Sequence, residues 1–499
     1  MKQFFLLTTL LIISCSISKA QTKSQHQTFV EVGGIVSSNE RTPFWLRANQ
    51  FGIVPYSSPA GTLRAGVTGS VLLTDTAGIY ARKAPSRAWV LSYSAEAVGN
   101  VGKENRLLAP EYYVKLAHRQ LELVVGRRRE VTGVVDTLLT SGSYSWSGNA
   151  LPIPKVRFGT KGFAHIGRRK WLGINAFIAH GWMANTNYMQ QSFLHQKSLI
   201  LRIGKPLSAI HFYVGINHVA QWAGRSDSLD YHYAVNGQLP NQLRDFPNVL
   251  FAVRMNGLNN PRVTSFDYVN MYGNHIGNYD FGIALRLPAV SLLVYHQHSF
   301  DDLSGILFRN MPDGLSGIQI RPTRHGSSAF RLEAVLLEFL STMNQSGAIF
   351  DPNVEQTETG ADNYFNNRQY QDGWTYKNRI VGTPFITLKQ DVKPDNQKNT
   401  GWVINNNRVQ VAHIAMRSTI ARRMNVVAKV SYSKNYGVPM ESFSRPLAQW
   451  SSLIQVGTPL PWLGETLLTA SVAADFGQLY TNATGVSVGL RKTVWYQTR

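Results

Sequence analysis

The segment from Arg408 to Lys434 alternates apolar and polar residues along two arms that a short polar turn, 421–425, connects. The apolar residues of each arm share one parity: Ala412, Ile414, Met416 and Ile420, then Val426, Ala428, Val430 and Tyr432. A period of two over about ten residues is typical of a β-strand with one apolar and one polar face. Because about 9–11 tilted residues cross a bilayer, the pattern predicts one hairpin of a transmembrane β-barrel, apolar outside and polar inside.

The same alternation recurs along the chain. It predicts strands over 29–36, 64–74, 89–98, 112–116, 121–127, 171–183, 198–203, 210–221, 281–287, 290–298, 330–337, 467–476 and 486–494. Long segments rich in Asn, Gly, Pro and Tyr separate some of them: 141–157, 222–275, 299–325, 343–406 and 434–450. Short turns that alternate with long loops are typical of a barrel with periplasmic turns and extracellular loops. We therefore predict an all-β fold, a large antiparallel transmembrane β-barrel.

The first twenty residues predict a secretory signal peptide. A basic start and a short apolar run, Phe4–Ile13, precede the small residues of Ser18-Lys19-Ala20, so we expect cleavage after Ala20 and a barrel domain over 21–499. Lipoprotein processing is the alternative, because Ile12-Ile13-Ser14-Cys15 resembles a lipobox. Cys15 is the single cysteine of the chain. Cleavage after Ala20 therefore leaves no disulfide, thiolate metal site or cysteine nucleophile.

The chain carries a formal net charge of +21 at pH 7, with only 16% charged residues and 11% aromatic residues. Nucleic acid is a common partner of basic chains, but an exported protein rarely meets it. We expect outer-membrane lipids, lipopolysaccharide phosphates and acidic polysaccharides as partners instead. The alternative is that the charge only faces anionic headgroups and a polar lumen. No stretch after the signal reaches 18 apolar residues, so no transmembrane helix is predicted.

The long loops combine the residue types that bind sugars. Flat aromatic rings contact the apolar sides of pyranoses, and arginine binds carboxylates. The candidate glycan-binding residues are Tyr144, Trp146, Trp222, Arg225, Arg368, Trp374, Tyr376 and Arg379. The alternative is that these aromatics form interface girdles or pack folded loops. For Arg127-Arg128-Arg129, which follows a strand, we favour contact with phosphate headgroups over a place in the lumen or on a glycan.

One strand end suggests two enzymatic alternatives. Ser299 with His296 and a nearby acid could form a lipase-like site. His296 and His298, with Asp301 close by, could bind a metal. Neither signal is specific, because alternate residues of a strand always share a face. We therefore expect no enzyme activity, no catalytic residues, no cofactor and no metal.

Several motifs resemble the Wzi family of capsule-assembly outer-membrane proteins. They are Thr42-Pro-Phe-Trp-Leu-Arg-Ala-Asn-Gln-Phe-Gly-Ile-Val-Pro55, Ser141-Gly-Ser, Gly148-Asn-Ala-Leu-Pro-Ile-Pro154, Asp313-Gly-Leu-Ser-Gly317, Glu338-Phe-Leu-Ser-Thr-Met-Asn-Gln-Ser-Gly347, Asp362-Asn-Tyr-Phe-Asn-Asn367, Gly373-Trp-Thr-Tyr376 and Asn405-Asn-Asn-Arg-Val409. The resemblance implies a barrel of about 18 antiparallel strands. It also implies a surface lectin that helps capsular polysaccharide or exopolysaccharide associate with the cell. The family places a helical bundle before or beneath the barrel, and 21–28 leaves little room for one. If the barrel has a periplasmic plug, it must then come from a loop.

The combined expectation is a non-enzymatic, polysaccharide-binding protein of the Gram-negative outer membrane, with its long loops facing the cell surface. Its partner would be an acidic capsular polysaccharide or exopolysaccharide. The main alternative is an anion-selective porin, because a basic lumen selects anions. A plugged lumen favours the lectin, and an open lumen favours the porin.

Overall fold

The computed structural model describes residues 24–73, 88–255, 260–323, 329–347, 360, 362–399, 401–439 and 441–498. The predicted signal peptide, 1–20, and the alternative lipoprotein site at Cys15 lie outside the described residues. The strand predicted to follow a polar lead at 21–27 already begins at Ser24.

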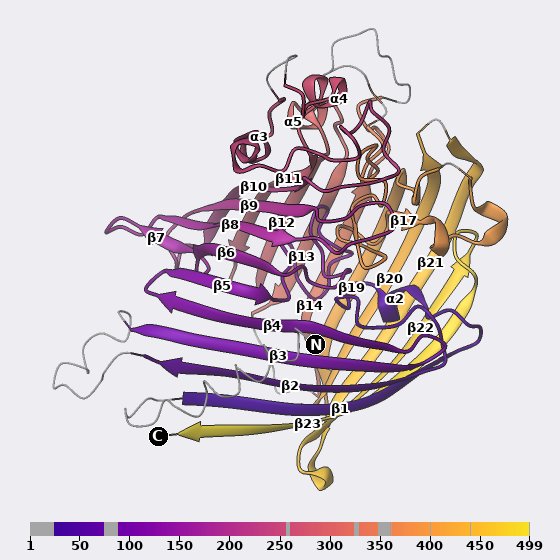
Figure 1. Cartoon of the computed structure of the whole chain (residues 1–499). Helices are drawn as coiled ribbons and strands as arrows, with labels where there is room; N and C mark the ends of the chain where they lie inside the picture. Colours follow the sequence, from indigo (N-terminus) through magenta and orange to yellow (C-terminus); the bar gives the residue numbers. More distant parts are fainter. Residues whose placement is uncertain are drawn as a thin grey trace.

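The described chain forms one closed antiparallel β-barrel (Figure 1). Its strands are β1 (Ser24–Ser37), β2 (Ala60–Leu72), β3 (Trp89–Gly102), β4 (Arg106–His118), β5 (Leu121–Arg127), β6 (Lys155–Thr160), β7 (Ala164–Ile166), β8 (Leu172–Trp182), β9 (Phe193–Ile203), β10 (Ile210–Trp222), β11 (Asn274–Arg286), β12 (Val290–Phe300), β13 (Gly314–Pro322), β14 (Phe330–Ser341), β19 (Val409–Ile420), β20 (Met424–Val438), β21 (Glu441–Leu460), β22 (Thr466–Gly477) and β23 (Ala483–Thr498). Both β6 and β7 pair with β8, so together they occupy one position and the barrel has 18 strands. Pairing of β1 with β23 closes the ring.

The hairpin of β19 and β20 confirms the predicted faces. Ile414 and Val430 point outward and are 55% and 43% exposed. Their neighbours His413 and Ser431 point inward and are 1% exposed each, and His413 Nδ1 lies 2.8 Å from Ser431 Oγ. The barrel therefore presents an apolar wall to lipid and a polar wall to its lumen, as expected for a transmembrane barrel.

Four strands of the barrel lie in places where the sequence predicted loops or no strand. They are β6, β7, β13 and β21. The predicted long loop 434–450 is wrong, because only residues 439 and 440 separate β20 from β21. Its composition resembled that of a loop because inward residues such as Asn435 and Gln449 are polar, and both are buried within the barrel. A polar lumen thus hides part of the alternation on which the strand prediction relied.

The connections divide the barrel into two ends. One end, here called the long-loop end, carries the connections 38–59, 128–154, 183–192, 223–273, 301–313 and 342–408. The opposite, short-turn end carries hairpin turns such as 119–120 and 421–423. The connections contain the short elements α2 (Phe44–Arg47), η3 (Leu243–Asp245), α3 (Phe246–Phe251), α4 (Ser265–Val269), α5 (Leu303–Ile306), β15 (Thr375–Tyr376), β16 (Arg379–Ile380), β17 (Thr387–Leu388), η5 (Lys389–Asp391), η6 (Pro394–Asn396), β18 (Ile404–Asn406) and η7 (Pro461–Leu463). Among the residues described, no helix is long and apolar enough to span a membrane.

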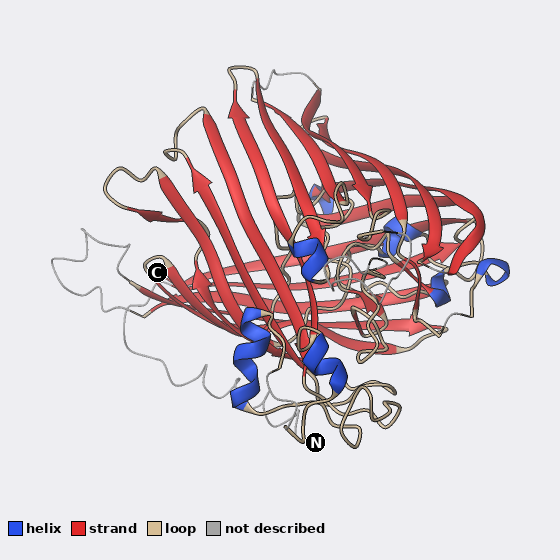
Figure 2. Cartoon of the chain, turned by 90° about the horizontal axis from the view of Figure 1, so that it is seen from above, coloured by secondary structure: helices blue, strands red, loops and turns tan. Residues whose placement is uncertain are grey.

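Three connections fold into the lumen and form a plug, which consists of 38–59, 128–154 and the described part of 362–408. Figure 2 shows loop segments crossing the space inside the ring of strands. One apolar cluster joins Phe44, Trp45, Leu139 and Phe385 of the plug to inner-wall residues such as Leu336 and Val411. A second cluster joins Tyr144, Trp374 and Ile380 to Leu194, Val219 and Ile276. The plug therefore comes from loops and no separate helical domain contributes to it within the described residues.

Polar contacts fix the plug to the inner wall. Glu338 of β14 accepts hydrogen bonds from Thr140 Oγ1 at 2.7 Å and from the Ser141 N–H at 2.6 Å. Asp475 of β22 accepts one from the Phe44 N–H at 2.7 Å. These bonds give the inward carboxylates partners that a buried polar group requires.

The arginine run at the end of β5 lies inside the barrel. Arg128 pairs with Glu122 at 3.1 Å, and Arg129 pairs with Glu96 at 2.9 Å. The side chains of Arg128 and Arg129 are only 18% and 23% exposed. The predicted contact with headgroups is therefore wrong for these two residues. Inward glutamates of β5 and β3 attract them, and the sequence pattern did not reveal these contacts.

Replacement of Trp45 with alanine should loosen the plug and leave the barrel intact. Trp45 is 1% exposed, and its Nε1 donates to Ser431 Oγ at 3.1 Å. Truncation of a buried tryptophan costs about 3–5 kcal/mol of stability. Here this loss weakens the packing of 38–59 against the inner wall. We expect faster trypsin cleavage after Arg41 or Arg47 in the folded protein, measured by mass spectrometry.

The matched control is Trp450→Ala on the outer wall, where Trp450 is 53% exposed. This variant should keep the cleavage rate of the wild-type protein. Equal protection of 38–59 in both variants would contradict the role of Trp45 as an anchor of the plug.

Candidate functional site

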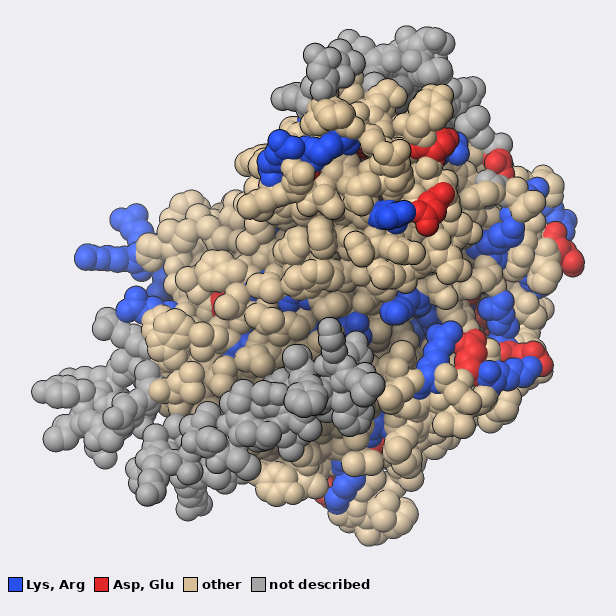
Figure 3. All heavy atoms as spheres, viewed as in Figure 1, with Lys and Arg blue, Asp and Glu red and all other residues tan. Residues whose placement is uncertain are grey.

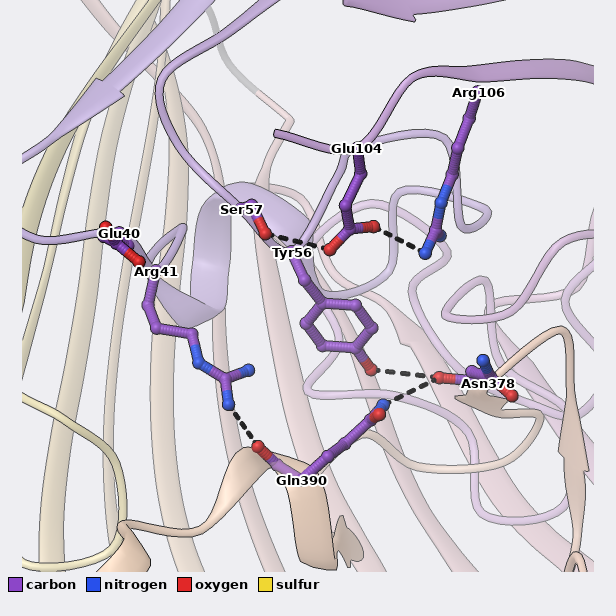
Figure 4. Close-up of a pocket in the computed structure, with 8 residues that line it drawn as sticks. All are labelled: Glu40, Arg41, Tyr56, Ser57, Glu104, Arg106, Asn378 and Gln390. Atoms are coloured by element: carbon purple, nitrogen blue, oxygen red, sulfur yellow. Dashed lines mark hydrogen bonds and ion pairs between the residues drawn. The ribbon is translucent and has the colours of Figure 1, made fainter. Parts of the chain in front are cut away.

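A polar cavity of about 400 Å³ opens in the plug at the long-loop end (Figure 4). Three parts of the chain line it: the 38–59 connection, the turn between β3 and β4, and the 362–408 segment. The lining residues are Glu40, Arg41, Tyr56, Ser57, Glu104, Arg106, Asn378 and Gln390. The cavity thus exists only when these distant segments come together.

A tight hairpin places Asn378 in the cavity wall. β15 and β16 pair with each other across Lys377 and Asn378. Both connecting residues have positive φ values, 52° and 60°. Two-residue hairpin turns favour this left-handed conformation, and asparagine adopts it readily. The Asn378 carbonyl then accepts a hydrogen bond from the Tyr56 hydroxyl at 3.1 Å.

Charged and polar groups alternate around the cavity. Glu104 accepts a hydrogen bond from Ser57 Oγ at 2.8 Å and pairs with Arg106 at 2.5 Å. On the opposite side, Arg41 donates to the Gln390 carbonyl. The side chains of Arg41 and Arg106 are 44% and 35% exposed, so a ligand can reach both guanidinium groups.

A second layer supports the ring of Tyr56. The guanidinium carbon of Arg379 lies 3.6 Å from the ring centroid, and that of Arg47 lies 4.8 Å from it. Asp391 lies 3.5 Å from Arg47 and balances part of this charge. Burial raises the pKa of the Tyr56 hydroxyl, Asp391 adds to the rise, and the arginines oppose it. The hydroxyl therefore stays protonated at neutral pH and acts as a hydrogen-bond donor.

This arrangement can bind a polyhydroxylated, acidic ligand. Arginine offers planar pairs of donors to carboxylates. The carboxylates, amide and carbonyl groups of the lining can accept hydrogen bonds from sugar hydroxyls. The lining therefore combines two arginines with carboxylate, hydroxyl, amide and carbonyl groups.

The structure places the eight predicted residues in two environments. Six are buried: Tyr144, Trp146, Trp222, Trp374, Tyr376 and Arg379. Arg225 and Arg368 are exposed. Arg225 pairs with Asp227 at 3.2 Å, and the Arg368 guanidinium lies 4.3 Å from the ring centroid of Trp402.

Four of the buried residues belong to one cluster of the plug, namely Tyr144, Trp146, Trp374 and Tyr376. Trp374 donates from its Nε1 to the Ser145 carbonyl at 3.0 Å. Arg379 connects the plug to the cavity through Tyr56, whereas Trp222 lies apart in another cluster. The buried residues other than Trp222 therefore hold together the segments that carry the cavity. Direct contact of the eight residues with a glycan stays a prediction.

The residues that line the cavity are not among the eight predicted from the sequence. Tyr56 directly follows the 42–55 motif, which was a usable signal. Glu104 and Arg106 lie at a short turn between two strands, whereas all eight predicted residues lie in segments that the sequence predicted as long loops. A ligand can reach the guanidinium groups of Arg41 and Arg106. Nothing in the sequence around these two arginines distinguishes them from other arginines of the chain.

The suggested nucleophile and base at the end of β12 do not meet. His296 points outward, and its Nδ1 lies 2.9 Å from Ser316 Oγ. Ser299 has the opposite parity, points inward and is fully buried. His296 therefore does not contact Ser299 as a general base does.

Asp301 joins two segments of the plug. It accepts hydrogen bonds from the Tyr144 hydroxyl at 2.9 Å and from the Phe365 N–H at 2.7 Å. Burial raises the pKa of Asp301 from 3.8 to about 7, although both hydrogen bonds oppose the rise. The folded protein thus holds a proton on Asp301 at pH values where the unfolded chain releases it.

A family model described as capsule assembly protein Wzi matches residues 74–417. Among solved structures, the chain is similar to Wzi of Escherichia coli, described as an outer membrane protein involved in group 1 capsule assembly and as a carbohydrate-binding β-barrel. The identity is 15% and the TM-score 0.56, over 97% of this chain and 87% of that chain. OpdQ of Pseudomonas aeruginosa matches at 8% identity and a TM-score of 0.46, over 95% of this chain and 99% of that one. A search of curated proteins gives no match.

The raised pKa of Asp301 predicts a pH-dependent stability of the plug. Because the folded pKa is raised, the stabilisation is complete below pH 3.8 and is lost as pH rises through about 7. Asp301→Asn removes this titration. We expect the thermal unfolding midpoint of the wild-type protein to fall, relative to that of the variant, as the pH rises from 3.8 to about 7. Thermal unfolding in detergent measures both midpoints.

Asp227→Asn is the matched control, because the Asp227 side chain is 81% exposed. It should keep the pH dependence of the wild-type protein. The same pH dependence in wild type and Asp301→Asn would show that Asp301 does not titrate in this way.

Proposed function

The chain belongs to the Wzi family of capsule assembly proteins, and from this premise we propose that it retains an acidic capsular polysaccharide or exopolysaccharide at the cell surface. The observation that carries the proposal is the combination of a filled lumen with a polar, arginine-containing cavity on the plug. The protein acts by binding and carries out no reaction.

The filled lumen separates this proposal from the porin alternative. Within the described residues, two apolar clusters run from the plug into opposite parts of the inner wall. A pore for anions needs a water-filled path past polar groups. Close-packed side chains such as Trp45 and Trp374 occupy this space instead.

In the orientation usual for outer-membrane barrels, the cavity faces the polysaccharide. Outer-membrane barrels have short periplasmic turns and long extracellular loops. We infer that the long-loop end faces the cell surface and that both ends of the described chain face the periplasm. The cavity and the exposed Arg225 and Arg368 then lie on the same, external side.

Capture proceeds by several weak contacts. Arg41 and Arg106 bind a carboxylate of one sugar unit, and Arg225 and Arg368 bind further units of the same polymer. Because the units are linked, each contact raises the effective concentration of the next one. The net charge of +21 adds a general attraction for an acidic polymer.

Substitution of the two cavity arginines should weaken binding of acidic polysaccharide from the protein's own organism. Loss of a hydrogen bond to a charged group costs about 1.5–3 kcal/mol, which corresponds to roughly tenfold or more in affinity. We expect Arg41→Gln and Arg106→Gln each to produce such a loss. Calorimetry with the purified protein in detergent, repeated over a salt series, measures it.

Arg331→Gln and Arg417→Gln are the matched controls. Their side chains are 45% and 44% exposed, and both lie toward the short-turn end. They should bind as the wild-type protein does. Saturable binding that all four variants retain would exclude the cavity as the site. Absence of binding by the wild-type protein at every salt concentration, together with anion conductance in a planar bilayer, would favour a porin.

A further inference from the structure

Two connections at the long-loop end cover the outer wall of the barrel. They are 241–255, which contains η3 and α3, and 301–313, which contains α5. We call them the outer caps. Figure 1 shows α3 beside the end of β10, and Figure 3 shows basic side chains on the surface in this region.

Strand parity shows that the first cap lies outside the barrel. Leu199 and Ile203 of β9 point outward and are 41% and 37% exposed. His195 and Lys197 share their parity and therefore point outward too, yet His195 is fully buried. Something on the outer face must cover His195.

The cover is α3. The ring of Phe246 lies 5.3 Å from the ring of His195 and 5.6 Å from that of Trp222. Lys197 Nζ donates to the Leu250 carbonyl. Helix α3 therefore packs against the outer surface of β9 and β10.

The second cap packs in the same way against the outer surface of β11 and β12. Tyr279 and His298 share the outward parity of Phe281 and Val294, which are 39% and 43% exposed. The ring of Phe308 stacks on both, at 5.2 Å from Tyr279 and 4.5 Å from His298. The two caps thus cover neighbouring parts of the wall.

Internal hydrogen bonds give both caps a defined shape. Asp245 accepts two bonds from Arg262, at 2.8 and 3.0 Å, and is 2% exposed. In the second cap, Asn310 Nδ2 donates to the Ser299 carbonyl at 2.8 Å, and Asp302 accepts from the Gly305 N–H at 3.2 Å. The caps are therefore built elements of the fold.

The caps carry apolar side chains that remain exposed. These are Leu243 (85% exposed), Phe251 (69%), Val253 (47%), Leu307 (51%), Phe308 (42%) and Met311 (51%). Three of them directly precede an exposed arginine, in the pairs Leu243-Arg244, Val253-Arg254 and Phe308-Arg309. Apolar residues beside basic residues are typical of segments that lie in a membrane interface.

We propose that the outer caps dock on the lipid leaflet at the long-loop end, with their apolar side chains among acyl chains and their arginines on the phosphate groups of an anionic lipid. Two observations favour this occupant. The caps continue the exposed apolar surface of β9–β12, which already faces lipid, and their arginines complement phosphate charge. The proposal goes beyond polysaccharide binding and requires only that the barrel lies in the membrane.

The first test measures the depth of a cap in the bilayer. Residues 21–499 contain no cysteine, so Phe251→Cys gives a single position for an environment-sensitive dye. The labelled mature protein is inserted into vesicles of phosphatidylcholine with brominated acyl chains, which quench the dye on contact. We expect quenching as strong as that of Phe212→Cys, an outer-wall position that is 48% exposed.

Tyr231→Cys, which is 78% exposed in the 223–273 connection, serves as the unquenched control. A dye at position 251 that behaves like the dye at 231, while the dye at 212 is quenched, would overturn the proposal. The cap would then stand clear of the bilayer and offer its apolar surface to a protein. Neither result depends on polysaccharide binding, so failure here is distinct from failure of the proposed function.

The second test addresses the phosphate. A combined variant, Arg244→Gln with Arg254→Gln and Arg309→Gln, is compared with Arg168→Gln, Arg169→Gln and Arg422→Gln, which are exposed arginines at the short-turn end. Retention of fluorescent lipid A, with and without its phosphates, is measured after detergent extraction, with inorganic phosphate as competitor.

We expect the cap variant to retain severalfold less phosphorylated lipid A and an unchanged amount of the dephosphorylated form. The short-turn variant should retain both forms as the wild-type protein does. Equal losses in both variants would contradict a specific contact of the caps. Complete displacement by inorganic phosphate at matched concentration would show a simple anion site and would also contradict docking on lipid.

Discussion

The need to give inward polar groups a partner determines most of this structure. A barrel of 18 strands has an inner wall of polar side chains, because alternate residues must face away from lipid. Glu338 and Asp475 would be costly to bury without hydrogen bonds. Backbone N–H groups of Ser141 and Phe44 supply these bonds. The inner wall therefore holds the plug, and the plug in turn carries the cavity.

Local pattern was sufficient to predict the wall and insufficient to predict what lies inside it. The parity of Ile414 and Val430 follows from lipid contact alone, and the structure confirms it. The cavity depends on contacts such as that between Tyr56 and Asn378, which are 322 positions apart. Nothing in the residues near Tyr56 specifies this partner. Trp146 and Trp374 are of a residue type that suits sugar binding. In the structure, their rings pack plug segments together.

The long connections serve opposite sides of one wall. Those at 38–59 and 128–154 turn inward and meet polar strand residues, whereas α3 and α5 turn outward and meet a face where histidines interrupt the apolar surface. His195 and His298 are buried there beneath Phe246 and Phe308. A polar residue on the lipid face is costly. The phenylalanine rings that cover these two histidines explain how the wall tolerates them at this end.

A second layer of residues supports the wall of the cavity. Arg379 and Arg47 hold the Tyr56 ring from behind, and Asp391 holds Arg47. Under the proposed function, a ligand meets side chains that the protein already supports, so less conformational entropy is lost on binding. Arg41 and Arg106 are more exposed than this second layer, and each has a protein partner, Gln390 and Glu104. A supported wall with accessible cations at its mouth suits the several weak contacts that the proposed function requires.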